Sequence, residues 1–213
     1  VTRQNTCSSV FWPNKDINTN YLAEDSTGPR EVLRIAKVDA TSIDNEISRP
    51  VDVVKLDIHG SELDALIGAT NTLKTAKFVL VETWTQEVYK GQPLHHDVDA
   101  FLRDHGYEAL DIQVAAAWER PSIFKLNSIR KELIGLEVLY FNKRDFELSN
   151  SYYKYSLLLS IFGFTSFALW ICDNKSFQFN QSLKNNILTA HKKHQLRKRF
   201  SLKFILQAIA ARL

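Results

Sequence analysis

Two short apolar segments, each ending in a carboxylate, constrain the fold of this chain more than any other feature. The first is V-D-V-V-K-L-D at Val51–Asp57, a β-branched run bounded by proline and glycine, and the second is F-V-L-V-E at Phe78–Glu82. Both patterns predict strands, and the residues between them predict a helix. A strand–helix–strand unit of this length is typical of a parallel crossover. Ligands bind beyond the carboxyl ends of parallel strands, so we expect Asp57 and Glu82 to mark one site.

The helix between these strands has a recognisable beginning. Ser61 followed by Asp64 resembles a capping box with Asp in place of the usual Glu, which predicts that the helix begins at Ser61. Gly60, directly before it, predicts a backbone with positive φ or a close backbone approach. Apolar residues recur at helical spacing and predict the buried face of the helix, which comprises Leu63, Leu66, Ile67 and Leu73.

The flanking segments complete a mixed α/β pattern. Helices are expected at 17–24, 41–47 and 94–105, and further strands at 31–39, 107–114 and 135–142. Gly106 is a natural residue to end the third helix. The last two strands are separated by a long loop that carries Trp118 and Pro121, which predicts an antiparallel hairpin at the edge of the sheet. That loop is available to cover a substrate.

Composition predicts one full domain with an appendage. The chain has 213 residues, a net charge of +3 and 45% hydrophobic residues, values typical of a globular protein and too weakly basic to imply a nucleic-acid partner. We place the domain boundary between residues 148 and 149. Cys7 and Cys172 are far apart and have no metal-ligand spacing, which argues against a disulfide framework and fits a reducing cytoplasm. The chain contains no methionine, which suggests a fragment of a longer protein.

The extension, 149–213, is helical in pattern and basic. Its apolar run Leu157–Cys172 is shorter than the roughly 20 residues that span a bilayer, so it is interpreted as a buried or interfacial helix. The segment H-K-K-H-Q-L-R-K-R-F at His191–Phe200 precedes a second amphipathic stretch. A solvated helix face is the usual explanation for such a segment. The alternative is peripheral contact with an anionic membrane or a phosphate-rich partner.

An ordered set of motifs resembles the FkbM-type methyltransferases. The core of the resemblance is K-L-D-I-H-G-S-E-L-D-A-L-I-G-A, beginning at Lys55. Upstream, C-S-S-V-F-W-P-N at Cys7–Asn14 and V-D-A-T-S-I-D at Val38–Asp44 match further family segments. Downstream, V-E-T-W, Y-K-G-Q and F-L-R-D-H-G-Y follow in the expected order, so the resemblance covers roughly residues 5–145.

The resemblance implies a Rossmann-like class I methyltransferase fold that uses S-adenosylmethionine. It implies O-methylation of a sugar or other small metabolite. The family's Gly-rich cofactor loop and ribose-binding carboxylate lie ahead of the point where this sequence begins, and nothing in the chain matches D-x-G-x-x-x-G. The expected fold is therefore N-terminally truncated, with an edge antiparallel hairpin and a helical C-terminal extension. Such a chain would hold half of a cofactor site.

Candidate site residues follow from the strand ends and the family motifs. Asp57 could position the acceptor hydroxyl or the cofactor, or act as a general base, although a carboxylate there could also only cap the turn. His59 replaces the Glu or Gln that the family often carries, and a turn histidine could serve as a base. The expected catalytic residues are Asp57, His59 and Glu82; the expected cofactor contacts are Asp57, Gly60 and Glu62; the expected substrate contacts are Ser8, Ser9, Trp84 and Tyr89.

Several of these residues have an equally good structural interpretation. The two serines could fix a loop through side-chain hydrogen bonds, and the two aromatic residues could serve packing alone. Glu62 lies in the first helical turn, where the helix dipole by itself favours a carboxylate. His95 and His96 are interpreted as solvated surface because adjacent helical residues face different ways, and no metal site is expected.

Lys55 stands in an apolar strand, where an unpaired ammonium would be costly. Because Glu82 is expected on the neighbouring strand, we expect a structural Lys55–Glu82 ion pair with Asp57 beside it. The leading functional hypothesis is a cytoplasmic methyltransferase acting on a small-molecule or carbohydrate substrate. The alternative is a non-catalytic remnant or an interaction module that binds a protein partner or a membrane surface.

Overall fold

The computed structural model describes residues 1–123, 129–148 and 150–194, and the chain divides into two compact units. The first unit is Val1–Glu147 and the second is Leu148–Leu213. The first unit contains the sheet and all the expected site residues.

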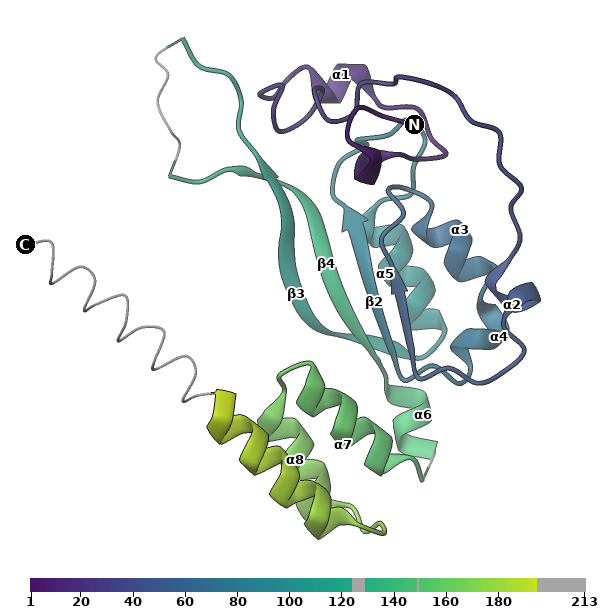
Figure 1. Ribbon diagram of the computed structural model, residues 1–213, viewed down its shortest axis with the longest axis vertical. Coiled ribbons are helices and arrows are strands. Elements are labelled where there is room, and N and C mark those ends of the chain that lie inside the picture. The colour runs from purple at the N-terminus through teal and green to yellow at the C-terminus, as the bar shows by residue number, and fades with distance from the viewer. Residues whose placement is uncertain (124–128, 149, 195–213) are drawn as a thin grey trace, which may run out of the picture. The chain divides into compact units, whose positions relative to one another are not determined.

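The sheet of the first unit has four strands in the order β1-β2-β4-β3 (Figure 1). They are β1 (Val53–Leu56), β2 (Phe78–Trp84), β3 (Tyr107–Trp118) and β4 (Glu132–Asn142). β1 pairs with β2 in parallel, whereas β4 pairs antiparallel with both β2 and β3. The expected parallel pairing of the first two strands is therefore confirmed, as is the antiparallel hairpin. The sheet is mixed, because two of its three pairings are antiparallel.

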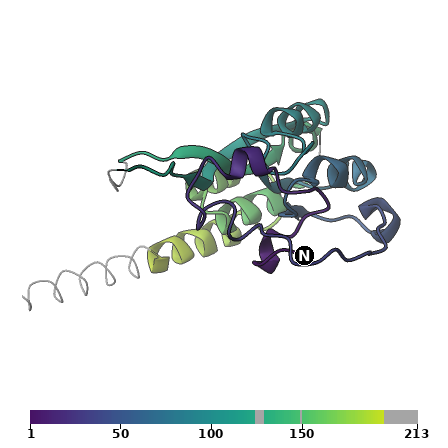
Figure 2. The same cartoon turned by 90° about the horizontal axis from the view of Figure 1, so that it is seen from above.

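Helices cover one face of the sheet. They are α3 (Glu62–Ile67), α4 (Thr70–Leu73) and α5 (His95–Asp104). Figure 1 shows α5 behind the strands, and in Figure 2, seen from above, it lies to one side of them. The side chains between these helices and the strands form the main core, which contains Val54, Leu56, Leu66, Ala69, Leu73, Ala76, Val79, Val81, Val98, Leu102, Tyr107, Leu136, Val138 and Tyr140. Every second residue of β1 and β2 enters this core, as the period of two in a strand requires.

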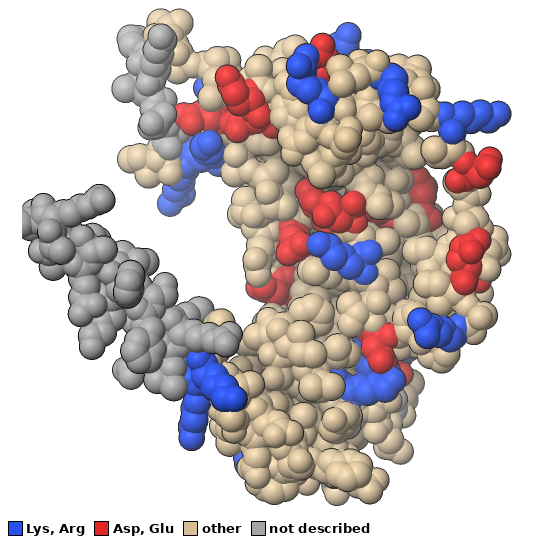
Figure 3. Space-filling model, viewed as in Figure 1, with Lys and Arg blue, Asp and Glu red and all other residues tan. Residues whose placement is uncertain are grey.

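The remaining residues of these strands point to the opposite face, which we call the open face. Register places Lys55 beside Leu80 and Glu82 beside Glu137 on this face. Its two ends are covered: Phe78 packs near Phe141, which in turn contacts Phe146 of α6 (Lys143–Leu148), and Trp84 is buried at the other end. Between these covered ends the face carries the charged residues Lys55, Glu82 and Glu137, and Figure 3 shows acidic side chains gathered near its middle around a basic one.

A second core lies at the carboxyl ends of the strands, beneath the N-terminal segment. It comprises Tyr21, Trp84, Val88, Tyr89, Trp118 and Ile134. The N-terminal segment contains the short helices η1 (Asn5–Cys7) and α1 (Lys15–Asn18), of which the second replaces the helix expected at 17–24. Trp118 ends β3 and is 4% exposed, so it belongs to the sheet and not to the long loop. The sequence pattern predicts a strand only as far as residue 114, whereas β3 continues to Trp118.

The strand expected at 31–39 is wrong. Only an isolated bridge joins Thr2 to Val32, and residues 33–41 have no regular structure and are exposed. An alternating pattern describes a strand that is half-buried against a neighbour, and no strand of the described residues pairs with this segment. Leu33, Ile35 and Val38 consequently expose more than half of their surface. The helical turn expected immediately afterwards is confirmed as α2 (Ile43–Glu46).

The helix after β1 begins at the expected residue but without the expected side-chain cap. Ser61 is the N-cap residue of α3, yet its side chain makes no capping hydrogen bond, so the predicted capping box is wrong. The predicted buried face is right at Leu66, which is fully buried, and wrong at Ile67, which is 54% exposed. Ile67 is the last residue of α3, where the helix ends one position after the buried Leu66.

The third expected helix is confirmed as α5. Asp97 Oδ2 accepts a hydrogen bond from the backbone N–H of Leu94 at 2.8 Å and so ties down the beginning of the helix. Gly106 follows the helix with φ of 89°, a conformation that favours glycine.

The second unit is helical. The single helix expected at 157–172 is instead two helices, α7 (Tyr152–Ile161) and α8 (Thr165–Asn174), because Gly163 takes φ of 94° between them. Ser156 Oγ donates to the Ala168 carbonyl at 2.9 Å and links the pair. Residues 180–194 are also helical. Cys172 in this unit and Cys7 in the first are both buried and unbridged.

Within the described ranges, no helix has both the length and the apolar character required to cross a bilayer. The basic segment His191–Phe200, interpreted as a solvated helix face with membrane contact as the alternative, lies mostly outside the described residues, which end at 194.

Adjacent residues of α3 provide a test of the core. Leu66→Ala is expected to lower the free energy of unfolding by about 2–5 kcal/mol, because it opens a cavity at a fully buried position. Ile67→Ala, at the exposed neighbouring position, is expected to cost less than about 1 kcal/mol. Urea unfolding of both variants measures the difference. Equal losses would contradict the assignment of the buried face.

Candidate active site

Asp57 and Glu82 lie side by side at the carboxyl end of the parallel strand pair. Asp57 directly follows β1, and Glu82 lies on β2 two residues before its end. Register pairs Leu56 with Val81, so the next position of each strand brings these two carboxylates to the same level of the sheet. The juxtaposition expected from the two strand ends is therefore present.

The turn after Asp57 is held by Glu62. One oxygen of its carboxylate accepts from the backbone N–H of Ile58 at 3.0 Å, and the other accepts from that of Gly60 at 2.8 Å. The side chain is 3% exposed, and burial raises the pKa of this carboxyl, a change that the backbone N–H donors oppose. Glu62 was expected to contact the cofactor, but here both its oxygens are engaged by the turn. It positions Asp57 and His59.

Gly60 takes φ of 113°, which favours glycine, and His59 before it takes φ of 54°. A Cβ at Gly60 would lie 3.3 Å from both Gln92 and Phe11, so a side chain there would also meet the N-terminal segment. The turn is therefore fixed by two left-handed residues and a buried carboxylate. Strained backbone of this kind is concentrated at functional sites.

Glu82 has the most perturbed carboxyl group of the site. Burial raises its pKa to about 7, and the neighbouring Asp57 adds to this through a hydrogen bond and its charge. Glu62 and Glu137 raise the pKa further through charge alone. Like charges that crowd one partly buried place favour the protonated form of one of them. Near neutral pH, Glu82 therefore exchanges a proton readily.

Lys55 does not pair with Glu82. Its ammonium lies 3.9 Å from Asp57 Oδ2, and its side chain is 57% exposed on the open face. The expectation of a buried structural pair is wrong because β1 is covered by helices on one face only, so a lysine on the other face reaches water. An exposed pair of this kind stabilises a protein only weakly.

His59 connects the carboxylates to the second core. Its Nε2 lies 3.8 Å from Asp57 Oδ1, and its ring lies 5.8 Å from the Trp84 ring between centroids. Burial lowers its pKa, against the opposing charge of Asp57, and the positive charge of Arg30 adds to the lowering. A neutral imidazole beside Asp57 is suited to accept a proton.

The two serines of the N-terminal segment fix loops. Ser9 Oγ donates to the His59 carbonyl at 2.5 Å and accepts from the backbone N–H of Phe11 at 3.0 Å. Ser8 Oγ accepts from the backbone N–H of Thr2 at 3.2 Å. In this state both expected substrate contacts hold the N-terminal segment, and only Ser9 touches the site, through its turn.

Trp84 and Tyr89, also expected to contact substrate, are 1% and 0% exposed. Tyr89 Oη donates to the Cys7 carbonyl at 2.7 Å, and the two rings meet edge to face at 6.2 Å. Both side chains form the wall between the strand ends and the N-terminal segment. Burial raises the pKa of Tyr89 to about 12, so its hydroxyl stays protonated at neutral pH.

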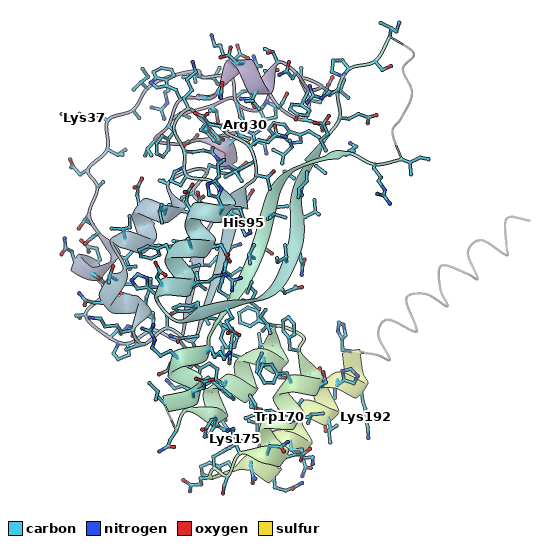
Figure 4. The ribbon with its side chains drawn as sticks, turned by 180° about the vertical axis from the view of Figure 1, so that it is seen from behind. Arg30, Lys37, His95, Trp170, Lys175 and Lys192 are labelled. Atoms are coloured by element: carbon cyan, nitrogen blue, oxygen red, sulfur yellow. The ribbon has the colours of Figure 1, made fainter. Side chains whose placement is uncertain are left out.

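Two residues of this region were missed by sequence reasoning. Glu137 faces Glu82 across β2 and β4, a pairing that only the strand register reveals. Arg30 is 6% exposed although it follows a polar Gly-Pro turn, and Figure 4 shows it in the N-terminal segment at the strand ends. Its only sequence signal is a basic residue beside a turn, which ordinarily indicates a solvated loop.

The two histidines at the start of α5 are separate from the site chemistry. His95 Nδ1 lies 3.1 Å from Thr83 Oγ1, and His96 is exposed beside Asp97. No group of three or more metal-ligating side chains is present in the described part of the chain.

Comparison with known protein families shows to which family the chain belongs. The model of the methyltransferase FkbM domain matches residues 3–109, which is half of the chain. The chain belongs to the FkbM methyltransferase family. No curated protein and no solved structure gave a significant match.

The part matched as a methyltransferase FkbM domain contains the strand-end carboxylates, the turn held by Glu62, and Arg30. Glu137 and Trp118 lie beyond it, on the antiparallel hairpin. The hairpin thus contributes to the candidate site from outside the matched region, since Glu137 raises the pKa of Glu82.

The pKa of Glu82 predicts a dependence of stability on pH. Because this pKa is about 7 in the folded chain and near 4.5 otherwise, the folded state binds more protons between these values. Stability is therefore lost as pH rises through that window. Glu82→Gln removes this loss. The free energy of unfolding of the variant is therefore expected to equal that of the parent at about pH 4. At about pH 8 it is expected to be larger by on the order of 1 kcal/mol, after allowance for solvent screening.

Thermal unfolding at several pH values measures this difference. Glu24→Gln, at an exposed carboxylate, controls for the loss of one negative charge. A parent and a Glu82→Gln variant that differ by the same amount at all pH values would contradict the raised pKa.

Proposed function

We propose that this FkbM-family methyltransferase transfers the methyl group of S-adenosylmethionine to a hydroxyl oxygen of a sugar or other small metabolite. The observation that carries the proposal is the pair of carboxylates at the strand ends, with the pKa of Glu82 raised to about 7. Family membership supports methyl transfer, and the carboxylate pair supports an acceptor that must lose a proton.

The residues present fit one end of the cofactor. S-adenosylmethionine carries a positive sulfonium and an ammonium group, and the open face offers Asp57, Glu82 and Glu137 beside the turn. Opposite charge at short distance favours such a ligand. Among the described residues there is no Gly-rich loop after a strand to complement its other end. Asp57 and Glu82 are the residues that would hold the sulfonium end.

The acid–base step belongs to the carboxylates. Bound S-adenosylmethionine supplies the electrophilic methyl group. The acceptor hydroxyl would donate a hydrogen bond to Glu82 or Asp57, and that carboxylate would take the proton as the methyl group passes from the sulfonium sulfur, whose S–C bond breaks, to the hydroxyl oxygen. A carboxylate of raised pKa is a stronger base than an ordinary one, and alignment of the hydroxyl contributes the rest. His59, neutral and 3.8 Å from Asp57, can accept the proton in turn.

The chain of residues 1–213 by itself is expected to bind S-adenosylmethionine weakly or not at all. A formed pocket supplies apolar walls together with polar groups on more than one side of its ligand, and the carboxylates described here face only one end of the cofactor. Calorimetric titration of the purified chain measures the affinity. Micromolar binding would contradict this expectation and would show that the cofactor site is complete within the chain.

Asp57→Asn is expected to lower methyl transfer at least tenfold, about 1.4 kcal/mol of barrier, in a form of the protein that shows turnover. The substitution retains size and hydrogen-bonding capacity but removes a charge that raises the pKa of Glu82, so the remaining base weakens. Release of S-adenosylhomocysteine with a panel of hydroxylated acceptors measures the rate.

Asp64→Asn, on the exposed side of α3, makes the same change of charge away from the strand ends and is expected to retain full turnover. Unchanged turnover in Asp57→Asn would place the chemistry on another residue. Absence of transfer with every acceptor tested, in the presence of bound S-adenosylmethionine, would instead favour an interaction module.

A further inference from the structure

Arg30 is a buried cation whose charge no carboxylate balances. It is 6% exposed, and in the described ranges no carboxylate lies within ion-pair distance of it. Its guanidinium lies over three aromatic rings, 4.8 Å from Trp118, 5.5 Å from Trp84 and 5.7 Å from Tyr89. Cation–π contacts stabilise the charge, but they bind none of the N–H groups. Burial of a charge without an opposite one costs several kcal/mol in typical proteins.

The hydrogen bonds of Arg30 leave one donor of its guanidinium unused. Nη1 donates to the carbonyl oxygens of Asp25 at 3.4 Å and Ser26 at 3.2 Å, whereas the buried Nε has no partner. The Nε side of a guanidinium is one of the two edges that can bind both oxygens of a carboxylate or phosphate. The guanidinium also donates to the Tyr89 hydroxyl, which lowers the pKa of that group, so Nε–H is the donor of Arg30 that stays unused within the second core.

Three neighbouring side chains also bury nitrogen atoms without a partner. They are Trp84 Nε1, Gln92 Nε2 and His59 Nδ1, and a contact of the His59 ring with the Thr6 backbone raises the pKa of that ring. Trp84 contacts both Arg30 and His59 through its ring, and Gln92 lies against Gly60, next to His59. The indole and amide nitrogens can only donate, and Nδ1 of a neutral histidine donates in one tautomer. Buried polar groups are nearly always hydrogen-bonded, so four unsatisfied nitrogens in one cluster require an explanation.

We propose that Arg30, His59, Trp84 and Gln92 form a binding site for an anionic group, a carboxylate or a phosphate, carried by the ligand of this protein. An anion supplies the acceptors that these four nitrogens lack and the charge that Arg30 lacks. The site adjoins the strand ends, because His59 belongs to both: its Nδ1 is in the cluster and its Nε2 faces Asp57. A bound ligand would then place its anionic group at Arg30 and its cationic or hydroxyl group at the carboxylates.

The N-terminal segment covers this site. Phe11 packs where a side chain at Gly60 would stand, and Ser9 bonds the His59 carbonyl. Entry of an anion therefore requires this segment to shift. The assignment of the anion to the methyl acceptor rests on the proposed function. The binding of an anion by the cluster does not rest on it.

Thermal unfolding at constant ionic strength tests the site without any methyl donor. Inorganic phosphate and acetate are compared with chloride, and glucuronate is compared with glucose, which lacks the carboxylate. The anions are expected to raise the unfolding temperature of the parent by several degrees at saturation, since a ligand that binds only the folded state stabilises it. Chloride and glucose are expected to leave it unchanged. Tryptophan fluorescence follows the same titrations, because Trp84 and Trp118 flank Arg30.

Two variants assign the effect to the cluster. Arg30→Lys retains the charge but loses the Nε–H donor, and Gln92→Glu keeps the oxygen that accepts from the Tyr89 N–H while replacing the amide nitrogen with a second oxygen. Each is expected to weaken anion binding at least tenfold. Arg34→Lys, at an exposed arginine of the same segment, is the matched control and is expected to bind like the parent.

A parent that responds equally to chloride, or variants that both retain the response, would overturn the proposal. If Arg30→Lys does not fold, Gln92→Glu alone decides. A response to glucuronate supports a site for a ligand-borne group, and a response to inorganic phosphate alone supports a site for the free ion. Because no methyl donor is present, failure here leaves the role of Asp57 and Glu82 standing, and a failed Asp57→Asn experiment leaves this site standing.

Discussion

The two hydrogen bonds from the turn amides to Glu62 are the interaction on which the site depends. They fold the chain back directly after β1, so that Asp57 follows the strand and His59 faces it. A carboxylate that accepts two backbone N–H groups out of solvent is strongly held, because either bond, if broken, leaves a buried donor unpaired. The left-handed residues His59 and Gly60 are sustained by these bonds. Without Glu62, the sheet could persist while the site lost its geometry.

Charge is separated across this turn. On the sheet side, Asp57, Glu82 and Glu137 crowd together and raise the pKa of Glu82; on the other side, Arg30 is buried among aromatic rings. His59 lies between the two, and its pKa responds to both signs. Acid and base character in a site is set by such differences of environment, not by residue type alone. A ligand that reached both sides would need groups of opposite character.

Several residues show why sequence reasoning reached part of this picture. Asp57 and Glu82 could be predicted together because parallel strands bring their carboxyl ends to one edge, a rule that needs only the strand pattern. Lys55 was misjudged because the prediction assumed that both faces of its strand are covered, and coverage is decided by helices distant in sequence. Arg30 and Glu137 were missed because each reaches the site through a partner more than 50 residues away in the chain.

Sequence by itself determined the local elements of this protein and its family. The strand–turn–helix–strand unit and the glycine that ends α5 follow from the chemistry of neighbouring residues, where backbone preferences and hydrophobic period act over a few positions. The family follows from the resemblance of the ordered motifs. Only the tertiary structure decided which carboxyl would hold a proton, which arginine would be buried and which lysine would reach water. Those outcomes depend on burial and on charges brought together by register and packing, and long-range packing has no local signature in the sequence.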